Sequence, residues 1–283
     1  MVHVTPKGNA VGGVTSLGDN VFVVRVNCGQ KIEVYDAKTF TLQRHITVPG
    51  LGKKNLRGFI RMVSDCNVLA ACPYNKCLYA SDCGSASVHR VELSGSNAAM
   101  KWSVAGWPAG LSVNSEHNLI VVSAGEHKLQ IFTTHGTLLQ NIKMQADIQY
   151  HRHAVQLPTT SQYLVSHCGF GSLHRVCLVG VDGAVVRRYG GQAGSKLTRM
   201  NWPSGLAVDR EGRILVADQD NDRLLVMDQS LSRAHEMSVS VDGCLNRPSS
   251  LWYDQSRRRL YIGELCGGGR VIVIGNMKDF RTK

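Results

Sequence analysis

Long apolar runs, heptad patterns and low-complexity tracts are all missing from this 283-residue sequence. No window approaches the roughly 20 apolar residues that cross a bilayer, so we expect no membrane association. The opening residues, MVHVTP, lack the basic and apolar regions of a secretory signal, and we therefore expect a cytoplasmic protein. No Pro/Gly/Ser-rich segment separates two cores, which predicts that residues 1–283 form a single domain.

Signatures of several enzyme classes are missing as well. The sequence has no Gly-x-Ser-x-Gly elbow, P-loop or dinucleotide fingerprint in a suitable context. Acidic residues are scarce relative to basic ones, 21 Asp and Glu against 32 Lys and Arg, which gives a formal net charge of +11. These features favour a protein that binds an anionic partner over an enzyme that needs a cofactor.

A repeated phrase organises the chain. Residues 202–228 read WPSGLAVDREGRILVADQDNDRLLVMD, which is three short apolar strands separated by polar turns. The Trp-Pro-x-Gly-Leu phrase returns at residues 107–132, and residues 247–274 repeat it with Ser250 in place of the glycine. The sequence is therefore an array of similar units.

The period of the array follows from a marker, often Cys-Gly, after the second strand of each unit. The markers begin at positions 28, 83, 124, 168, 219 and 266, so successive markers are 55, 41, 44, 51 and 47 residues apart. This spacing is typical of a four-stranded unit repeated six times. The cysteines at four of these markers would lie on different units, too far apart to pair, so we expect free thiols in a reducing compartment.

The predicted fold is all-β, a six-bladed β-propeller of four-stranded blades. Apolar residues run nearly unbroken through the first two strands of a unit, as expected if both faces of each sheet pack on neighbouring sheets. Candidate outer strands are residues 41–48, 137–143 and 235–241. The last unit lacks an obvious fourth strand, and we expect residues 2–4 to supply it, close the ring and remove an exposed edge.

Residues 203–226, PSGLAVDREGRILVADQDNDRLLV, resemble an NHL repeat, and residues 108–132 and 248–274 match the same pattern less fully. The resemblance implies a six-bladed propeller similar to the C-terminal domain of tripartite-motif NHL proteins, which recognises RNA or protein partners beside a ubiquitin-ligase RING. No Cys/His cluster with RING or B-box spacing is present in this sequence. Any role in ubiquitination therefore requires a ligase supplied elsewhere.

Positive charge gathers in the predicted connectors between blades, which emerge on one face of a propeller. Taken as residues 50–61, 105–108, 145–153, 190–203 and 243–248, the connectors hold eight basic residues against a single acid, Asp147. A basic rim of this kind is typical of a surface that binds polyanions. The alternative is that these are solvated loops that merely tolerate Lys and Arg.

The rim predicts a site for single-stranded RNA or an acidic protein segment. Arginine clamps phosphate bidentately and stacks on bases, and a propeller offers no helix that could enter a DNA groove. We expect the phosphates to meet Arg57, Arg61, Arg152 and Arg199, and the pocket to be shaped by His151, His153, Asn201 and Arg247. The alternative function is a monomeric substrate-recruiting module for ubiquitination that works with a ubiquitin-ligase partner.

Catalysis is the less favoured hypothesis, and we expect no cofactor. Aligning the inner strands on Ser204 places Val68, Ala109, His153 and Ser249 at the channel, with Gly13 in the first unit, and none of these is a carboxylate that could hold calcium. One group of residues could bind a metal ion, namely His151, His153 and His167. An extended His-x-His segment places two imidazoles on one side, and His167 ends the adjoining strand near them. A zinc-dependent propeller enzyme built on these histidines is thus the second alternative.

Overall fold

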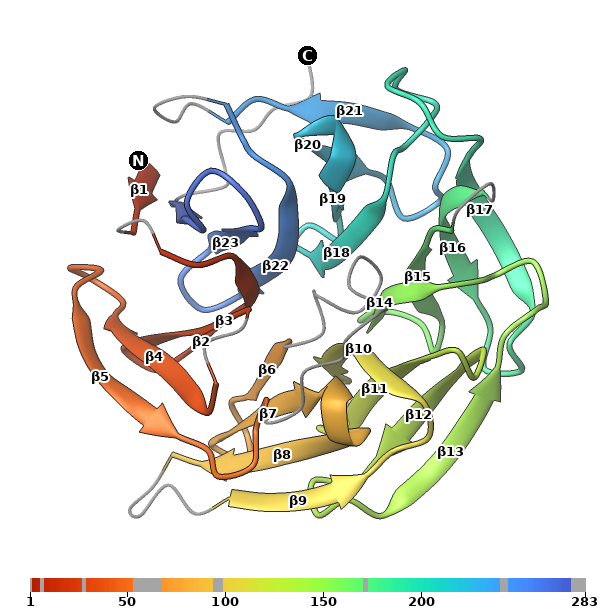
Figure 1. The fold of residues 1–283 in the computed structure, drawn as a ribbon. Coiled ribbons are helices and arrows are strands. Elements are labelled where there is room, and N and C mark those ends of the chain that lie inside the picture. The colour runs from red at the N-terminus through yellow and green to blue at the C-terminus, as the bar shows by residue number, and fades with distance from the viewer. Residues whose placement is uncertain are drawn as a thin grey trace.

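The computed structural model describes residues 2–5, 8–26, 29–52, 68–93, 99–169, 173–239 and 244–275. They form six four-stranded antiparallel sheets arranged as the blades of a ring (Figure 1). Blades 1 to 3 consist of β2 (Val11–Leu17), β3 (Asn20–Arg25), β4 (Lys31–Asp36) and β5 (Leu42–Thr47); β6 (Leu69–Cys72), β7 (Cys77–Asp82), β8 (Ser87–Glu92) and β9 (Ala99–Ser103); and β10 (Trp107–Val113), β11 (Leu119–Ala124), β12 (Lys128–Phe132) and β13 (Leu138–Lys143).

Blades 4 to 6 complete the ring, and the predicted six-bladed all-β fold is confirmed. These blades consist of β14 (His151–Gln156), β15 (Tyr163–His167), β16 (His174–Val179) and β17 (Val185–Gly191); β18 (Pro203–Val208), β19 (Ile214–Asp218), β20 (Arg223–Met227) and β21 (Ala234–Met237); and β22 (Pro248–Asp254), β23 (Arg259–Glu264), β24 (Val271–Ile274) and β1 (Val2–Val4). Short 3-10 turns at Cys83–Ser85 and Gln219–Asn221 follow the second strands of blades 2 and 5. None of the described residues forms a helix that is long and apolar enough to cross a membrane.

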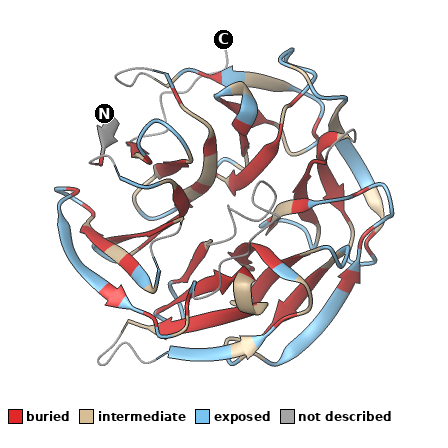
Figure 2. Cartoon of the chain, in the orientation of Figure 1, coloured by how far each residue is buried: buried red, intermediate tan, exposed pale blue. Residues whose placement is uncertain are grey.

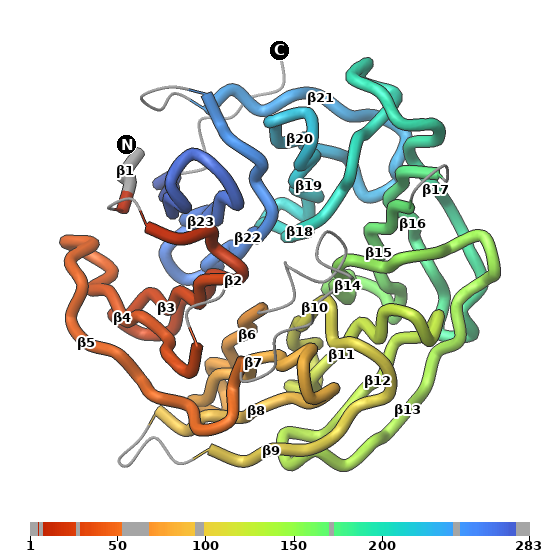
Figure 3. Tube along the Cα trace, viewed as in Figure 1, coloured from red at the N-terminus to blue at the C-terminus, as the bar shows by residue number. Residues whose placement is uncertain are grey.

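The N-terminal strand closes the ring, as predicted. In blade 6, β1 pairs antiparallel with β24, with Val2 opposite Ile274 and Val4 opposite Ile272. The Thr5 amide then donates to the Val271 carbonyl at 3.0 Å, which extends the pairing. The tube in Figure 3 passes once around the ring and brings β1 beside the last blade. One sheet therefore joins segments more than 260 residues apart.

The core lies between blades (Figure 2). Six clusters of buried apolar residues each join strands of two neighbouring blades, such as Leu224 and Leu260 between blades 5 and 6, or Ile120 and Val165 between blades 3 and 4. Both faces of each sheet are consequently apolar, which explains the nearly continuous hydrophobic runs of the inner strands. Burial is the main stabilising contribution, at about 25 cal/mol per Å² of apolar surface.

Glycines in alternate inner strands permit a close approach to the next blade. A Cβ atom on Gly110 would lie 2.5 Å from the carbonyl oxygen of Arg152, and one on Gly205 would lie 2.6 Å from that of Ser249. Real Cβ atoms do not approach backbone this closely. The glycine of the repeated Trp-Pro-x-Gly-Leu phrase is therefore required by blade packing, and not by a turn.

Candidate functional site

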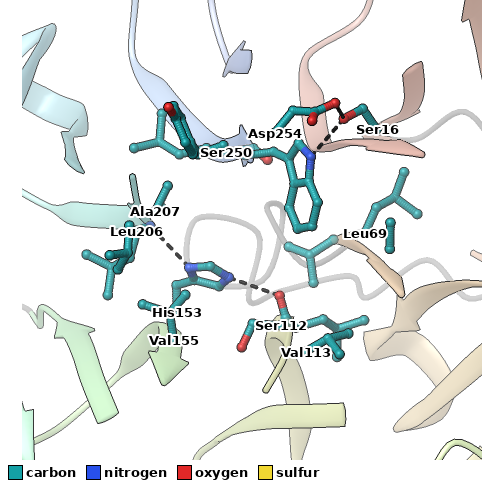
Figure 4. A pocket seen from close by; sticks show the side chains of 18 of the residues that line it. Ser16, Leu69, Ser112, Val113, His153, Val155, Leu206, Ala207, Ser250 and Asp254 are labelled. Atoms are coloured by element: carbon teal, nitrogen blue, oxygen red, sulfur yellow. Dashed lines mark hydrogen bonds between the residues drawn. The ribbon is translucent and has the colours of Figure 1, made fainter. Parts of the chain in front are cut away.

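Two faces and a central channel are available for binding. We call the face that carries the inter-blade connectors and the turns between second and third strands the upper face, and the opposite one the lower face. The six inner strands surround a channel of about 500 Å³ (Figure 4). Its lining runs from the first residues of the inner strands, including Arg152 and Ser204, to turns on the lower face that include Asn114 and Ser256.

Each inner strand of blades 1, 3, 4, 5 and 6 has an irregularity in its pairing near the upper end, and this corrects the predicted alignment. In blades 3 and 4 the pairing shifts across Ala109 and across Arg152. Arg152, and not His153, is thus the counterpart of Ala109, and Gly12 replaces Gly13 in blade 1 for the same reason. The sequence alignment missed this one-residue offset because blades 1 and 4 have Val11 and His151 in place of the proline that marks the register in blades 3, 5 and 6.

His153 is a bridge between blades 3 and 5. Its Nδ1 accepts a hydrogen bond from the Leu206 amide at 3.1 Å, and its Nε2 lies 3.0 Å from the Leu111 carbonyl oxygen (Figure 4). This pattern fits a neutral imidazole that carries its proton on Nε2. Burial lowers the pKa of His153, which keeps the ring neutral. Both ring nitrogens are committed to backbone partners, so His153 shapes the channel wall as a fixed support.

His151 and His167 lie directly opposite each other on β14 and β15, and both are buried, with exposed fractions of 0% and 1%. The ring of His127 packs edge-on against His151, with 5.8 Å between ring centroids. Burial, with smaller contributions from His127 and His167, lowers the pKa of His151 to about 3. Burial, followed by the charge of Arg175, lowers the pKa of His167 to about 4.

The predicted side-by-side arrangement of His151 and His153 is wrong, because the bulge at Arg152 breaks the alternation of the strand. His151 faces the neighbouring imidazoles, whereas His153 enters the channel wall. Across the described residues, no three His, Cys, Asp or Glu side chains are placed to hold a metal ion. The structure thus pairs His151 with His167 but places His153 apart from them, which breaks the set of three histidines on which the zinc hypothesis depended.

Arg152 reaches the upper end of the channel and stands over an indole ring. Its guanidinium carbon lies 6.0 Å from the ring centroid of Trp202, which is within range of a cation–π contact. Trp202 has a left-handed backbone, with φ of 61°, and its amide donates to Nδ1 of His174 at 2.9 Å. The indole ring of Trp202 is buried, so the protein holds the surface that Arg152 contacts in place.

Arg199 and Asn201 belong to the connector between blades 4 and 5. Arg199 is exposed, while its carbonyl oxygen accepts a hydrogen bond from the buried Arg223 at 3.0 Å. Asn201 is half-buried, and its backbone amide donates to the carboxylate of Asp218 at 2.7 Å. The ion pair between Asp218 and Arg223, at 2.7 Å, therefore anchors the connector that presents both predicted residues.

Arg247, the predicted residue in the connector before blade 6, is engaged with acidic neighbours. Its Nη2 lies 2.9 Å from the Asp220 carboxylate, and its amide donates to Asp222 at 2.7 Å. The ion pair leaves Arg247 less available to a phosphate than the connector sequence indicates. Arg57 and Arg61, with the nearby Lys53 and Lys54, lie outside the described residues.

The turns between second and third strands modify the predicted charge of the upper face. They add Glu126, Asp220 and Asp222 and also Arg270, which pairs with Glu264 at 2.7 Å; the count over connectors included none of these. Asp147 is offset by Arg175 at 2.9 Å and by Arg188 at 3.6 Å. In the described part of this face, the basic character is therefore concentrated in the connectors of blades 4 and 5, around Arg152, Lys196 and Arg199.

Arg257 and Arg258 lie in the turn between β22 and β23, and Arg259 begins β23. Two of these three arginines contact residues of blade 1. Arg257 binds Asp19 of blade 1 at 2.7 Å. Arg259 donates to the Ala37 carbonyl and stands 5.7 Å from the centroid of the Phe40 ring. These contacts tie blade 6 to blade 1 and contribute to ring closure.

Aromatic residues recur at the start of the inner strands of three blades. Trp107, Tyr150 and Trp202 occupy equivalent positions in blades 3, 4 and 5, immediately before or at the first strand residue. Trp107 is 38% exposed and Tyr150 is 42% exposed, whereas Trp202 is buried. The recurrence of an aromatic residue just before this strand was the available signal, although exposure depends on the packing of each connector.

Comparisons with known proteins agree with this architecture. The family model described as NHL repeat matches residues 200–227, which include β18, β19 and β20. Protein brain tumor from Drosophila melanogaster is 24% identical over 137 residues, which is 47% of this chain and 12% of that protein. The chain thus corresponds to a small part of that relative's length.

Two solved structures share the fold at low sequence identity. A protein of unknown function from Bacteroides thetaiotaomicron has a TM-score of 0.73 and 13% identity, with 95% of this chain and 70% of that chain covered. A catalytically inactive virginiamycin B lyase from Staphylococcus aureus, solved with quinupristin, has a TM-score of 0.64 and 10% identity, with 99% and 90% covered. At these identities the likeness concerns the fold alone.

Proposed function

We propose that this chain, an NHL-repeat β-propeller, is a non-catalytic recognition platform that binds single-stranded RNA through its upper face. The observation that carries the proposal is the position of Arg152, whose guanidinium lies 6.0 Å from the Trp202 ring at the upper end of the channel. A cation held in this way can meet a phosphate or stack on a base.

Two exposed aromatic rings lie at the start of the inner strands of blades 3 and 4, the latter being the strand that carries Arg152. Tyr150, 42% exposed, lies two residues before Arg152, and Trp107 presents a 38% exposed indole at the equivalent position of blade 3. Stacking on an aromatic side chain contributes about 1–3 kcal/mol per base and tolerates any sequence. The upper face therefore offers surfaces for bases beside charges for phosphates.

Cations of the next connector extend the site. Lys196 and Arg199 are exposed on residues 190–203, and the buried Arg223 fixes this loop by donating to the carbonyl oxygens of Ser195, Lys196 and Arg199. A preorganised loop loses less conformational entropy when it binds a ligand. We assign Arg152 and Arg199 to phosphates, with Asn201 beside them as a hydrogen-bonding group.

The proposal includes no catalytic step. Asp254, a carboxylate in the channel lining, already accepts hydrogen bonds from Ser16 at 2.8 Å and Ser256 at 2.6 Å. His153 holds two backbone groups with its two ring nitrogens. Neither side chain is poised to move a proton on a substrate, because each is committed to a structural partner.

Fluorescence anisotropy with random single-stranded RNA at two or more salt concentrations tests the proposal. Phosphate contacts to a single strand release about 0.7 counterion each, so Arg152→Ala with Arg199→Ala should lower the salt slope by about 1.4. At every salt concentration, the RNA affinity of this double variant should be lower than that of the parent. The matched control is Arg44→Ala with Arg187→Ala, which removes two exposed arginines from the outer strands β5 and β17.

RNA binding that is equal in the upper-face variant and the control would refute the assignment. Failure of the parent to bind any single-stranded RNA would instead favour the alternative, an acidic protein segment recruited for ubiquitination. A protein contact should survive nuclease treatment and depend on a buried apolar anchor, whereas RNA binding should be abolished by single-stranded competitor.

A further inference from the structure

We propose that the lower half of the central channel is a binding site for a neutral, largely apolar small molecule. The volume of about 500 Å³ falls in the range of roughly 300–1,000 Å³ that is typical of small-molecule sites. This site is separate from the proposed RNA surface, because its mouth is formed by turns of the lower face.

The channel wall is an apolar ring around a space that the described residues leave open. Each blade contributes an apolar side chain that is only partly buried and packs with its outer side against an inter-blade cluster. These side chains all line the channel; Leu17, Val113, Val155, Val208 and Trp252 lie toward its lower end, and Val68 lies at the upper end of the inner strand of blade 2. Their remaining surface faces the cavity, so an apolar occupant would remove it from water, which is favourable.

Several polar groups of the wall already have hydrogen-bond partners, which argues for a neutral ligand. Ser112 donates to the Ala154 carbonyl at 2.7 Å, and His153 uses both ring nitrogens. The indole of Trp252 donates to Ser16 at 2.9 Å, and Ser16 in turn donates to Asp254. A charged ligand would lose its hydration without gaining partners from these groups, which is costly.

The mouth on the lower face offers a polar rim around this apolar interior. Asn114, Ser115, Gln156, Gln255 and Ser256 all line the opening. At the same edge His117 stacks on the exposed ring of Tyr74, with centroids 4.1 Å apart and nearly parallel planes. An apolar cavity with a few polar groups at its entrance is the usual arrangement of a small-molecule site.

The upper end limits the site to the lower half of the channel. Arg152 lines the channel there and is held over the ring of Trp202. A ligand that enters from the lower face therefore meets Val113, Val155 and Val208 near the lower ends of their strands. Figure 4 shows Val113 and Val155 around the same space as His153. We accordingly assign the binding energy to these apolar walls.

Binding of the neutral dye N-phenyl-1-naphthylamine, whose fluorescence rises in apolar surroundings, tests the proposal on the full chain. The parent should bind the dye saturably, and 1-decanol should displace it. Val155→Trp adds an indole to the channel and should weaken dye binding at least tenfold. Leu139→Trp is the matched control, because it adds the same side chain to the exposed surface of β13 and should leave binding unchanged.

Val113→Lys is a second variant, since this half-buried position near the mouth tolerates a charge better than the core. It should also weaken dye binding tenfold, and its melting curve shows whether it folds. Absence of saturable binding to the parent would overturn the proposal. The proposal would also be overturned if folded Val155→Trp or Val113→Lys bound the dye as tightly as the parent. A loss of dye binding in Leu139→Trp as large as that in Val155→Trp would overturn it too, because it would place the dye on the outer surface. RNA affinity measured in parallel reports on the upper face independently.

Discussion

Mild acid should destabilise this propeller through two buried imidazoles. The pKa of His151 is lowered to about 3 and that of His167 to about 4, mainly because burial disfavours the charged ring. An unfolded chain protonates histidine near pH 6.5. Above that pH both rings are neutral in the folded and unfolded states, so they add no pH dependence.

Below pH 6.5 the unfolded chain takes up two protons that the folded protein accepts only near pH 4 and pH 3. The free energy of unfolding therefore falls as the pH drops, by about 1.4 kcal/mol per pH unit for each ring. Between pH 6.5 and pH 5 each ring accounts for a loss of about 2 kcal/mol, or about 4 kcal/mol together. This is a large part of the 5–15 kcal/mol that stabilises a typical domain.

Urea unfolding followed by tryptophan fluorescence at pH 7, 6, 5.5 and 5 measures this loss. His151→Leu removes one titrating ring from the pair, so the fall in unfolding free energy between pH 7 and pH 5 should be about 2 kcal/mol smaller than in the parent. His135→Gln is the control, because it removes an imidazole from an exposed turn. If His151→Leu and the parent lose stability equally over this range, the buried pair does not control acid unfolding.

Three substitutions test other parts of the framework by the change in unfolding free energy. Gly110→Val would press a side chain into backbone 2.5 Å away, and overpacking of this kind should cost about 1–3 kcal/mol; a stability equal to that of the parent would contradict the close blade contact. Arg223→Met leaves the buried Asp218 unpaired and should cost about 3–5 kcal/mol, against less than about 0.5 kcal/mol for the exposed Arg233→Met. His153→Phe keeps a ring but removes the hydrogen-bond partner of two backbone groups, which should lower the unfolding free energy by about 1–3 kcal/mol for each group. An unchanged unfolding free energy would show that the bridge between blades 3 and 5 is dispensable.

The fold was predictable because repeat spacing and strand pattern are local properties. Each predicted outer strand appears within a few residues of its expected place, as with residues 41–48 and the observed Leu42–Thr47. The closing strand was also predictable, since three units offered a candidate outer strand whereas the last unit ended without one and residues 2–4 could supply it. Periodicity identifies such elements without knowledge of their neighbours in space.

The site was less predictable because it depends on small offsets and on pairing between distant residues. A single bulged residue at Arg152 turned His153 into a bridge and left His151 buried. Arg247 looked available in the sequence, but its acidic partner Asp220 lies 27 positions away in the chain. Contacts of this kind arise from the radial packing of blades, which leaves no mark on the local composition.

Ring closure by β1 also has a consequence for how the chain reaches its native state. The last blade cannot be completed until the strand at Val271–Ile274 has been synthesised, so Val2–Val4 must wait for its partner while the other five blades form. Contacts that span nearly the whole sequence form late and slow the final folding step. Once formed, the pairing of β1 with β24 opposes separation of blades 6 and 1, which is where the ring would otherwise open most readily.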